Sequence, residues 1–302
     1  MTQAPEMKIS ALAPWFGGNR SGAGEVGKLL GRLAWCGVVF AGGCAELPEI
    51  DARAGVANDL HCHLINLARV VKDDRLVVEM LELVDGMLFH PVEYAEAQTR
   101  CVARVKGAEV AALPGGAGGL FGGEDEPAPA AMMMPDVQWA ADYFACCWMG
   151  RGGSAGRDTE FQQGQALRWT PSGGGSAKRW RSAVESLRAW CHALKLWEFT
   201  RLDAFEFLAQ CRDMAGVGIY ADAPWPDDGD RYEFKFDTAK QRRLAKVLTG
   251  FTTARVVVRF GDHPLIRELY TEADGWRWHA LESKNQQGNA VAEVLLVRGG
   301  GA

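Results

Sequence analysis

The chain contains 302 residues, of which 48% are hydrophobic and 24% are charged, and its formal net charge is −5. This balance is typical of an ordinary soluble globular protein with one large domain or a domain with a sizeable insertion. No apolar run approaches the roughly 18 residues that span a bilayer. The N-terminal MTQAPEMKIS lacks the pattern of a secretory signal. We therefore expect a cytoplasmic protein without a membrane partner, and the acidic balance argues against a general polyanion binder.

Cysteine usage also favours a reducing compartment. Eight cysteines in this length are too sparse for a disulfide scaffold, and most of them sit among apolar residues, where a reduced thiol acts as a small hydrophobe. The run His61-Cys62-His63 contains metal-ligand side chains, but no CxxC pair accompanies it. Ordinary packing is the favoured interpretation of this run, and we predict no metal.

The first section, residues 8–70, has the pattern of alternating strands and helices. The apolar stretch AWCGVVF (34–40) predicts a strand that ends at the small-residue loop AGGCAE. GVAND (55–59) predicts a second strand that ends in an acid, and HLINLARVV (63–71) has helical spacing. Two strands that end in a glycine loop and an acid are what a nucleotide-binding parallel sheet needs.

The middle of the chain is different in composition. Residues 107–135 are rich in Gly, Ala and Pro without a clear period, and residues 170–179 (TPSGGGSAKR) are similar, so we expect both stretches to be mobile. Helical patterns lie at 139–148 and 179–197. These features predict an inserted, mainly helical region over 71–195.

The last hundred residues return to an α/β pattern. We expect a strand end and a helix in 198–211, a strand and its loop in 217–225, and a helix in 237–251. A buried strand follows in 254–260, then a short helix in 263–270 and a closing strand in 291–298. The predicted fold is therefore an α/β sheet made from residues 1–70 and 196–302, with the helical region inserted between them.

Five segments in this order resemble the Dam-like adenine-N6 DNA methyltransferases of the phage type. APWFGGNRSG (13–22) is similar to the family's Trp-x-Gly-Gly-Lys opening, and FAGGCAE (40–46) to its Phe-x-Gly-Gly-Gly methyl-donor loop. VANDLHCHLINLARVV (56–71) is similar to its acid and following helix, and RLDAFEFL (201–208) to the segment that contacts the donor's adenine. YADAPW (220–225) stands where the family has Asp-Pro-Pro-Tyr/Trp. The resemblance implies a Rossmann-like sheet, S-adenosylmethionine as methyl donor, no metal, and double-stranded DNA as partner.

The resemblance assigns catalysis to Asp222, Ala223, Pro224 and Trp225. A carboxylate and a backbone carbonyl, which the family takes from the residue after the acid, would accept both hydrogens of an adenine amine and free its lone pair. Trp225 would stack on a base that has left the duplex. The alternative is a plain turn, in which Asp222 caps and Trp225 packs on the sheet.

The resemblance also assigns a donor site. Gly42 and Gly43 would let the backbone approach the methionine part of the donor, Asp59 would bind the ribose hydroxyls, and Asp203 would read the adenine amine. The remaining implied members are Trp15, Phe16, Gly17 and Phe40. Each acid could instead be a helix N-cap, and Trp15 could be core.

Residues 151–200 hold eight Lys/Arg against four acids, which is unusual in an acidic protein. They stand where the family has its recognition region, and basic residues among glycines suit phosphate contacts. The predicted DNA-binding residues are Arg151, Arg157, Lys178, Arg179 and Arg181. For any single one of them, a solvated helix face is the simpler interpretation.

The chain departs from the family at two positions. Ala223 replaces a proline, which keeps the carbonyl but loosens the turn, and Asn19 replaces the opening lysine. A relative that binds DNA or donor without efficient turnover is therefore one alternative, and a methyltransferase acting on RNA or a small molecule is another. The acid at 222 favours adenine, because cytosine-N4 enzymes typically carry serine there. Arg259, Asp262 and Lys284 resemble closing segments of the branch and would line the base pocket. The sequence does not indicate whether a restriction partner exists.

Overall fold

The computed structural model describes residues 7–110, 134–151, 154–167, 169, 174–227, 229–284 and 290–300. The chain divides into two compact units. One, the sheet unit, comprises Gly17–Leu60, Gly156–Asp158 and Leu196–Ala302; the other, the helical unit, comprises Met1–Phe16, His61–Ala155 and Thr159–Lys195. Each unit is built from segments that are distant in the sequence.

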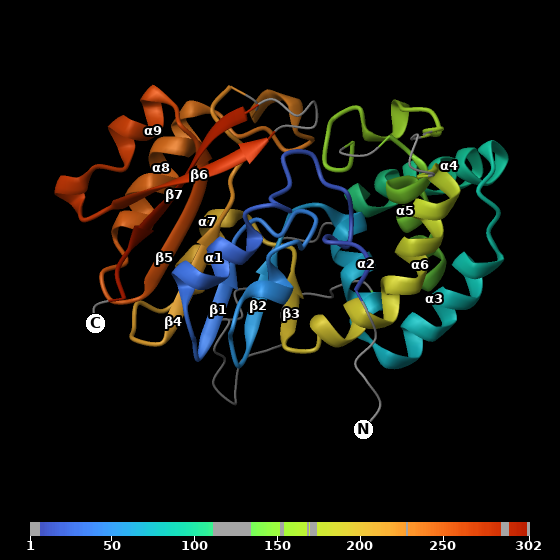
Figure 1. Ribbon diagram of the computed structural model, residues 1–302, viewed down its shortest axis with the longest axis horizontal. Coiled ribbons are helices and arrows are strands. Elements are labelled where there is room, and N and C mark those ends of the chain that lie inside the picture. The colour runs from blue at the N-terminus through green and yellow to red at the C-terminus, as the bar shows by residue number, and fades with distance from the viewer. Residues whose placement is uncertain are drawn as a thin grey trace. The chain divides into compact units, whose positions relative to one another are not determined.

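The sheet unit contains a seven-stranded mixed sheet in the order β3-β2-β1-β4-β5-β7-β6 (Figure 1). Strands β1 to β5 run parallel, and β7 lies antiparallel between β5 and β6. The central strands are buried along almost their whole length, which explains their continuous apolar sequences. The strands are β1 (Trp35–Val38), β2 (Gly55–Asn58), β3 (Trp197–Thr200), β4 (Val217–Ala221), β5 (Arg255–Gly261), β6 (Arg277–Lys284) and β7 (Ala290–Arg298).

Four helices accompany this sheet in the described residues. α1 packs against β5, while α8 contacts both α7 and α9. Asp237 caps α8 by accepting a hydrogen bond from the Lys240 amide at 2.8 Å, as its place before an amphipathic run predicts. The helices are α1 (Ala23–Leu30), α7 (Ala204–Gln210), α8 (Thr238–Thr249) and α9 (Pro264–Leu269), and single 3-10 turns lie at η1 (Leu47–Glu49), η3 (Gly229–Arg231) and η4 (Glu272–Asp274).

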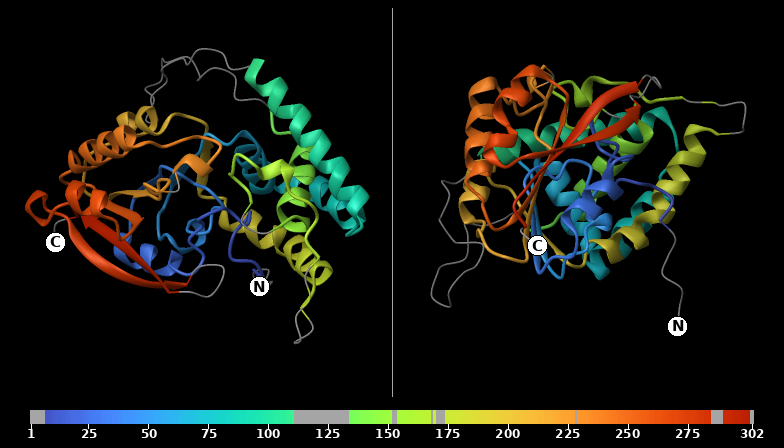
Figure 2. Two further views of the ribbon diagram at one scale, coloured as in Figure 1. Left: turned by 90° about the horizontal axis from the view of Figure 1, so that it is seen from above. Right: turned by 60° about the vertical axis from the view of Figure 1, so that its left-hand side comes forward.

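The helical unit is organised around α5, which contacts each of the other four helices of the unit. Its side chains from Trp139 to Met149 are all buried. Figure 2 shows the helices of this unit from two further directions. The polar Asp142 of α5 is buried and accepts hydrogen bonds from the Arg100 guanidinium at 2.9 Å. The helices are α2 (Cys62–Lys72), α3 (Asp74–Gly86), α4 (Pro91–Val110), α5 (Val137–Met149) and α6 (Ser176–Ala193), with a 3-10 turn at η2 (Glu160–Gln162). Among the described residues, no helix is both long and apolar enough to cross a membrane.

The predicted α/β class is confirmed, and the structure is compatible with a Rossmann-like fold. Each predicted strand and helix appears, but the helix predicted over 179–197 ends at Ala193 because Trp197 starts β3. The prediction missed β6 and α1, and it named no separate helices at α3 and α4 within the region that it expected to be helical. Of the stretch predicted mobile at 170–179, residues 176–179 instead form the first turn of α6, and residues 170–173 lie outside the described residues. Of the stretch 107–135, residues 107–110 end α4, and 111–133 lie outside the described residues.

Two segments that the sequence analysis grouped with the sheet lie in the helical unit. They are residues 7–16 and 61–70. The reason is that α2 packs its apolar face on α3, α5 and α6. A helix that follows a strand need not cover that strand's own sheet, and its sequence pattern does not say which surface it meets.

Candidate functional site

The site begins where the strand order of the sheet reverses. β1 pairs with β2 on one side and with β4 on the other, so the loops that leave β1 and β4 start side by side. The Val39 amide donates to the Tyr220 carbonyl at 2.9 Å, which continues the pairing to the last residues before both loops. In open α/β sheets, the crevice at this switch point is the usual place for a ligand.

The loop after β1 is shaped by glycine and held by an acid. Gly42 has φ 45°, a left-handed conformation that glycine adopts without strain. Its amide donates to Asp59 Oδ2 at 2.9 Å, so the predicted ribose-binding acid braces the predicted donor loop. Cys44, which follows Gly43, also has a left-handed φ of 60°.

A buried amide joins the ends of the first three strands. Asn58 Nδ2 donates to the carbonyls of Val39 at 3.2 Å and Leu202 at 3.0 Å. Its Oδ1 accepts from Thr200 Oγ1 at 2.9 Å and from the Leu202 amide at 2.8 Å. The residue before the predicted acid therefore fixes the loops that carry the site, a role that its sequence context did not reveal.

Asp203 is the N-cap of α7, because its Oδ1 accepts from the Phe205 amide at 2.8 Å. This oxygen therefore caps the helix, which is the alternative role that the sequence allowed for Asp203. Phe205 lies 6.4 Å from Phe236 between ring centroids, and Phe236 meets Phe40 edge-on at 5.6 Å. An aromatic cluster therefore connects the donor loop to the start of α7, and the sequence offered no signal for the part played by Phe236.

Asp222 follows β4 and is bound to a buried guanidinium. Arg259 Nη1 lies 2.9 Å from Asp222 Oδ2 and donates to the Gly17 carbonyl at 2.9 Å. Its Nε and Nη2 bind Glu293 Oε2 at 2.9 and 2.8 Å. The side chains of Asp222, Arg259 and Glu293 are 15%, 5% and 6% exposed, so solvent screens these charges little.

The electrostatics of this group are set by burial. Burial raises the pKa of Asp222, and the positive charge of Arg259 partly offsets that rise. Burial, with a smaller contribution from the Asp222 charge, raises the pKa of the nearby Glu46 to about 7. The site therefore combines two carboxyl groups whose protonation depends on one another and on one arginine.

The turn after Asp222 is held by side chains rather than by a proline at position 223. Ala223 is buried, and the fully buried Gln241 donates its amide to the Pro224 carbonyl at 2.6 Å. Trp225 lies with its ring 5.2 Å from the Arg259 guanidinium. A Cβ on Gly261 would come within 2.9 Å of the indole, so β5 approaches Trp225 closely only because position 261 is glycine.

Asn19 is buried beside the same site. Its Nδ2 donates to Tyr220 Oη at 3.4 Å, and its Oδ1 accepts from the Gly22 amide at 2.9 Å. Tyr220 Oη in turn donates to Glu46 Oε1 at 3.2 Å. Asn19 is therefore joined through Tyr220 to the Glu46 carboxyl group by a chain of hydrogen bonds.

Asp262 and Lys284 were also predicted to line the base pocket. Asp262 pairs with Arg267 at 2.6 Å on the surface. The side chain of Lys284 lies outside the described residues.

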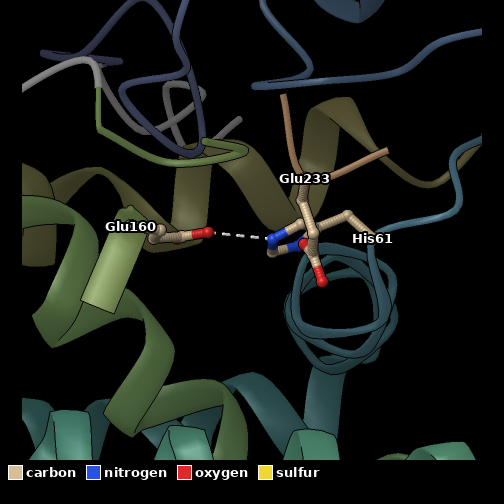
Figure 3. A group of neighbouring side chains, drawn as sticks. All are labelled: His61, Glu160 and Glu233. Atoms are coloured by element: carbon tan, nitrogen blue, oxygen red, sulfur yellow. Dashed lines mark hydrogen bonds and ion pairs between the residues drawn. The ribbon is translucent and has the colours of Figure 1, made fainter. Parts of the chain in front are cut away.

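The predicted residues Trp15 and Phe16 belong to the helical unit, whereas Gly17 belongs to the sheet unit. Trp15 meets the His61 ring edge-on at 5.1 Å. His61 Nδ1 accepts from the Leu64 amide at the start of α2, and its Nε2 lies 2.9 Å from Glu160 Oε2 (Figure 3). Figure 3 also labels Glu233, which belongs to the sheet unit. His63 stacks on Tyr143 at 5.0 Å, so both histidines have packing and hydrogen-bonding roles.

The predicted DNA-binding residues divide between the units. Arg157 lies in the sheet unit and the other four lie in the helical unit. Arg151, Lys178 and Arg181 are exposed, and Arg181 pairs with Asp85 at 3.0 Å. Arg179 lies over the Trp148 ring at 4.9 Å.

Sequence reasoning missed two exposed apolar side chains in the helical unit. Leu167 is 82% exposed and Trp169 is 79% exposed. Isolated backbone bridges pair Gly150 with Gln165 and Trp169 with Gly175. They connect the segment that carries Leu167 and Trp169 to the residue before Arg151 at one end and to the residue before α6 at the other. The sequence from 161 to 184 contains no acid.

No protein-family model matches the chain, and no curated protein matches it significantly.

Proposed function

We propose that this protein transfers a methyl group from S-adenosylmethionine to the N6 amine of an adenine in double-stranded DNA. One observation carries the proposal: Asp222 leaves β4 at the switch point of the sheet, next to the glycine loop that leaves β1. A carboxylate and a donor-type loop are thereby adjacent, as transfer between a bound donor and a bound amine requires.

The topology supports the same class. A parallel sheet whose last strand is inserted antiparallel beside the fifth is typical of S-adenosylmethionine-dependent methyltransferases, and β7 occupies that place between β5 and β6. Gly42 would bring the backbone close to the methionine part of the donor, and Asp59 would hold both the loop and the ribose. Phe40 and Phe205 would give the donor's adenine an apolar wall. These residues fit the donor, and its sulfonium would supply the methyl group.

The chain's own groups would prepare the acceptor. The adenine amine is a weak nucleophile because its lone pair is conjugated into the ring. Asp222 would accept a hydrogen bond from one amine N–H and the Ala223 carbonyl from the other, which draws the nitrogen toward a tetrahedral shape. The nitrogen would form the N–CH3 bond as the S–CH3 bond breaks, S-adenosylhomocysteine would leave, and the amine would lose one proton. Gln241 would keep the turn in place through the Pro224 carbonyl, offsetting the loss of proline at position 223. Trp225 would stack on the extruded base and repay part of the few kcal/mol that extrusion costs.

DNA is the favoured acceptor polymer because the helical unit exposes basic residues around an acid-free segment. Arg151 and Lys178 would contact phosphates, and Trp169 would add a stacking surface. A binding protein without turnover is the second candidate, since Asp222 Oδ2 is already paired with Arg259. A related transfer to RNA would use the same donor site.

The test is transfer of labelled methyl groups from S-adenosylmethionine to unmethylated genomic DNA, with total RNA as a parallel acceptor. Asp222→Asn keeps the shape of the side chain and removes its charge, and Asp222→Ala removes both. The matched control is Asp227→Asn, an acid in the same loop whose side chain is 85% exposed. We expect label in DNA from the wild type and the control, and loss of transfer in both Asp222 variants.

Equilibrium binding of S-adenosylmethionine to every variant separates a chemical defect from a folding defect. Donor and DNA binding without transfer by the wild type would support the binding protein. In that case Ala223→Pro tests whether the alanine is responsible. Label in RNA alone would make RNA the substrate.

A further inference from the structure

The guanidinium of Arg259 is shared between the buried Glu293 carboxylate, the largely buried Asp222 carboxylate and one backbone carbonyl. Its Nη1 donates hydrogen bonds to Asp222 and to the Gly17 carbonyl, while Nε and Nη2 donate to Glu293. These groups come from the turn after β4, from β7 and from the segment before α1, so a side chain on the central β5 joins three other parts of the sheet unit.

We propose that Arg259 and Glu293 are positioning residues that fix the orientation and the negative charge of Asp222. This inference rests on the proposed function, because it assigns the arginine a role in preparing the amine acceptor. Neither residue would touch the reacting atoms.

The hydrogen bonds of Arg259 determine the orientation of the Asp222 carboxylate. Glu293 Oε2 accepts from both Nε and Nη2, which fixes the plane of the guanidinium and turns Nη1 toward Asp222. Nη1 then binds Asp222 Oδ2 and fixes the rotation of the carboxylate. With Oδ2 occupied, the amine hydrogen of a bound adenine would go to Oδ1. A rigid planar fork suits this task better than a flexible lysine.

The net charge of this group is the sum over its three charged side chains. The carboxylates of Asp222 and Glu293 and the guanidinium of Arg259 leave one net negative charge in surroundings that are almost fully buried. Without the arginine, two like charges would lie close together out of water, and one of them would take up a proton. Burial and the negative charge of Glu293 raise the pKa of Asp222, whereas Arg259 lowers it; the charge of Asp222 in turn raises the pKa of the neighbouring Glu46 and Tyr220. Arg259 is therefore the cation in this described group that keeps Asp222 charged. The family's opening lysine is absent here, and Arg259 supplies a positive charge at Gly17, two residues before Asn19.

The experiment follows the titration of Asp222 directly. The protein is labelled with 13C at the aspartate carboxyl carbon, and the Asp222 signal is assigned by its loss in Asp222→Asn. Arg259→Gln alone would leave two carboxylates close together without this cation, which destabilises the folded protein. We therefore compare Glu293→Gln, which retains the shape of the acceptor, with the double variant Arg259→Gln/Glu293→Gln, in which Asp222 lacks its cation and position 293 carries no charge. Arg255→Lys is the matched control, because Arg255 also lies on β5 but donates only to backbone carbonyls.

We expect Asp222 in Glu293→Gln to titrate at a lower pH than in the wild type, because the guanidinium is no longer shared. In the double variant it should titrate at a clearly higher pH, and Arg255→Lys should match the wild type. An Asp222 signal with the same midpoint in Glu293→Gln and the double variant would overturn the inference.

Activity gives a second readout. In Arg259→Lys, kcat should fall about 10- to 100-fold while KM for S-adenosylmethionine stays within about twofold, because the loss is in the placement of the acceptor. The acid limb of kcat should move with the Asp222 midpoint in Glu293→Gln; an unmoved acid limb would contradict the role in catalysis. If the wild type transfers no methyl group, the proposed function fails, and the titration still decides whether Arg259 sets the charge of Asp222.

Discussion

Replacing Glu46 by glutamine should stabilise the protein at alkaline pH. Glu46 is buried, and its Oε1 accepts a hydrogen bond from Tyr220 at 3.2 Å. Burial, with a smaller contribution from the Asp222 charge, raises the pKa of this carboxyl from 4.5 to about 7. The amide oxygen of glutamine can accept the same hydrogen bond and carries no charge.

The magnitude follows from linkage between folding and protonation. The folded-state pKa lies above the unfolded one, so the contribution to stability is fully present below pH 4.5 and is lost as the pH rises through about 7. A difference of about 2.5 pKa units corresponds to about 3 kcal/mol at 1.36 kcal/mol per unit. Most of this change falls between pH 5 and pH 8.

The assay is urea unfolding of the wild type and Glu46→Gln at pH 5 and pH 8, with both readings taken at one ionic strength. Glu49→Gln is the control, because Glu49 is exposed and lies three residues away. We expect Glu46→Gln to unfold with a free energy about 3 kcal/mol higher than the wild type at pH 8 and much closer to it at pH 5. A gain of the same size at both pH values, or none at either, would refute the electrostatic reasoning.

Three further predictions concern the proposed site. Asp59→Ala removes the acceptor of the Gly42 amide and the proposed ribose contact, so the Kd for S-adenosylmethionine measured by calorimetry should rise about 10-fold or more; an unchanged Kd would remove Asp59 from the donor site. Gln241→Leu leaves the Pro224 carbonyl without this donor, so kcat should fall while donor affinity is kept, and equal kcat values would show that the turn does not need the amide. Trp169→Ala should weaken DNA binding about 5- to 100-fold in fluorescence anisotropy, as loss of base stacking does, with donor affinity unchanged; wild-type DNA affinity would place this indole outside the interface.

The sequence could predict the framework of the site because local patterns carry it. Continuous apolar runs predicted β4 and β5, and local patterns placed a glycine loop after the first strand and an acid after the second. The structure joins these two features by the hydrogen bond from the Gly42 amide to Asp59, which the sequence analysis did not predict. β6 escaped prediction because its sequence RWHALESK has no continuous apolar run, and it pairs only with β7 in the described residues.

The connections within the site lay beyond sequence reasoning because they depend on strand register. Arg259 reaches Glu293 only because β7 lies antiparallel beside β5. Nothing in the sequence around Asn58 distinguishes a residue whose side-chain amide joins the ends of three strands from a residue in an ordinary turn. Asp203 was assigned two roles, and geometry shows that one of its oxygens caps α7.

The most direct test of the proposed reaction is mass spectrometry of nucleosides from unmethylated double-stranded DNA incubated with the protein and S-adenosylmethionine bearing a deuterated methyl group. We predict N6-methyladenine carrying the deuterated methyl group with the wild type and with Asp227→Asn, and none with Asp222→Asn. Unlabelled or unmethylated adenine in every sample, from protein that binds both donor and DNA, would contradict the assignment of methyl transfer to this site.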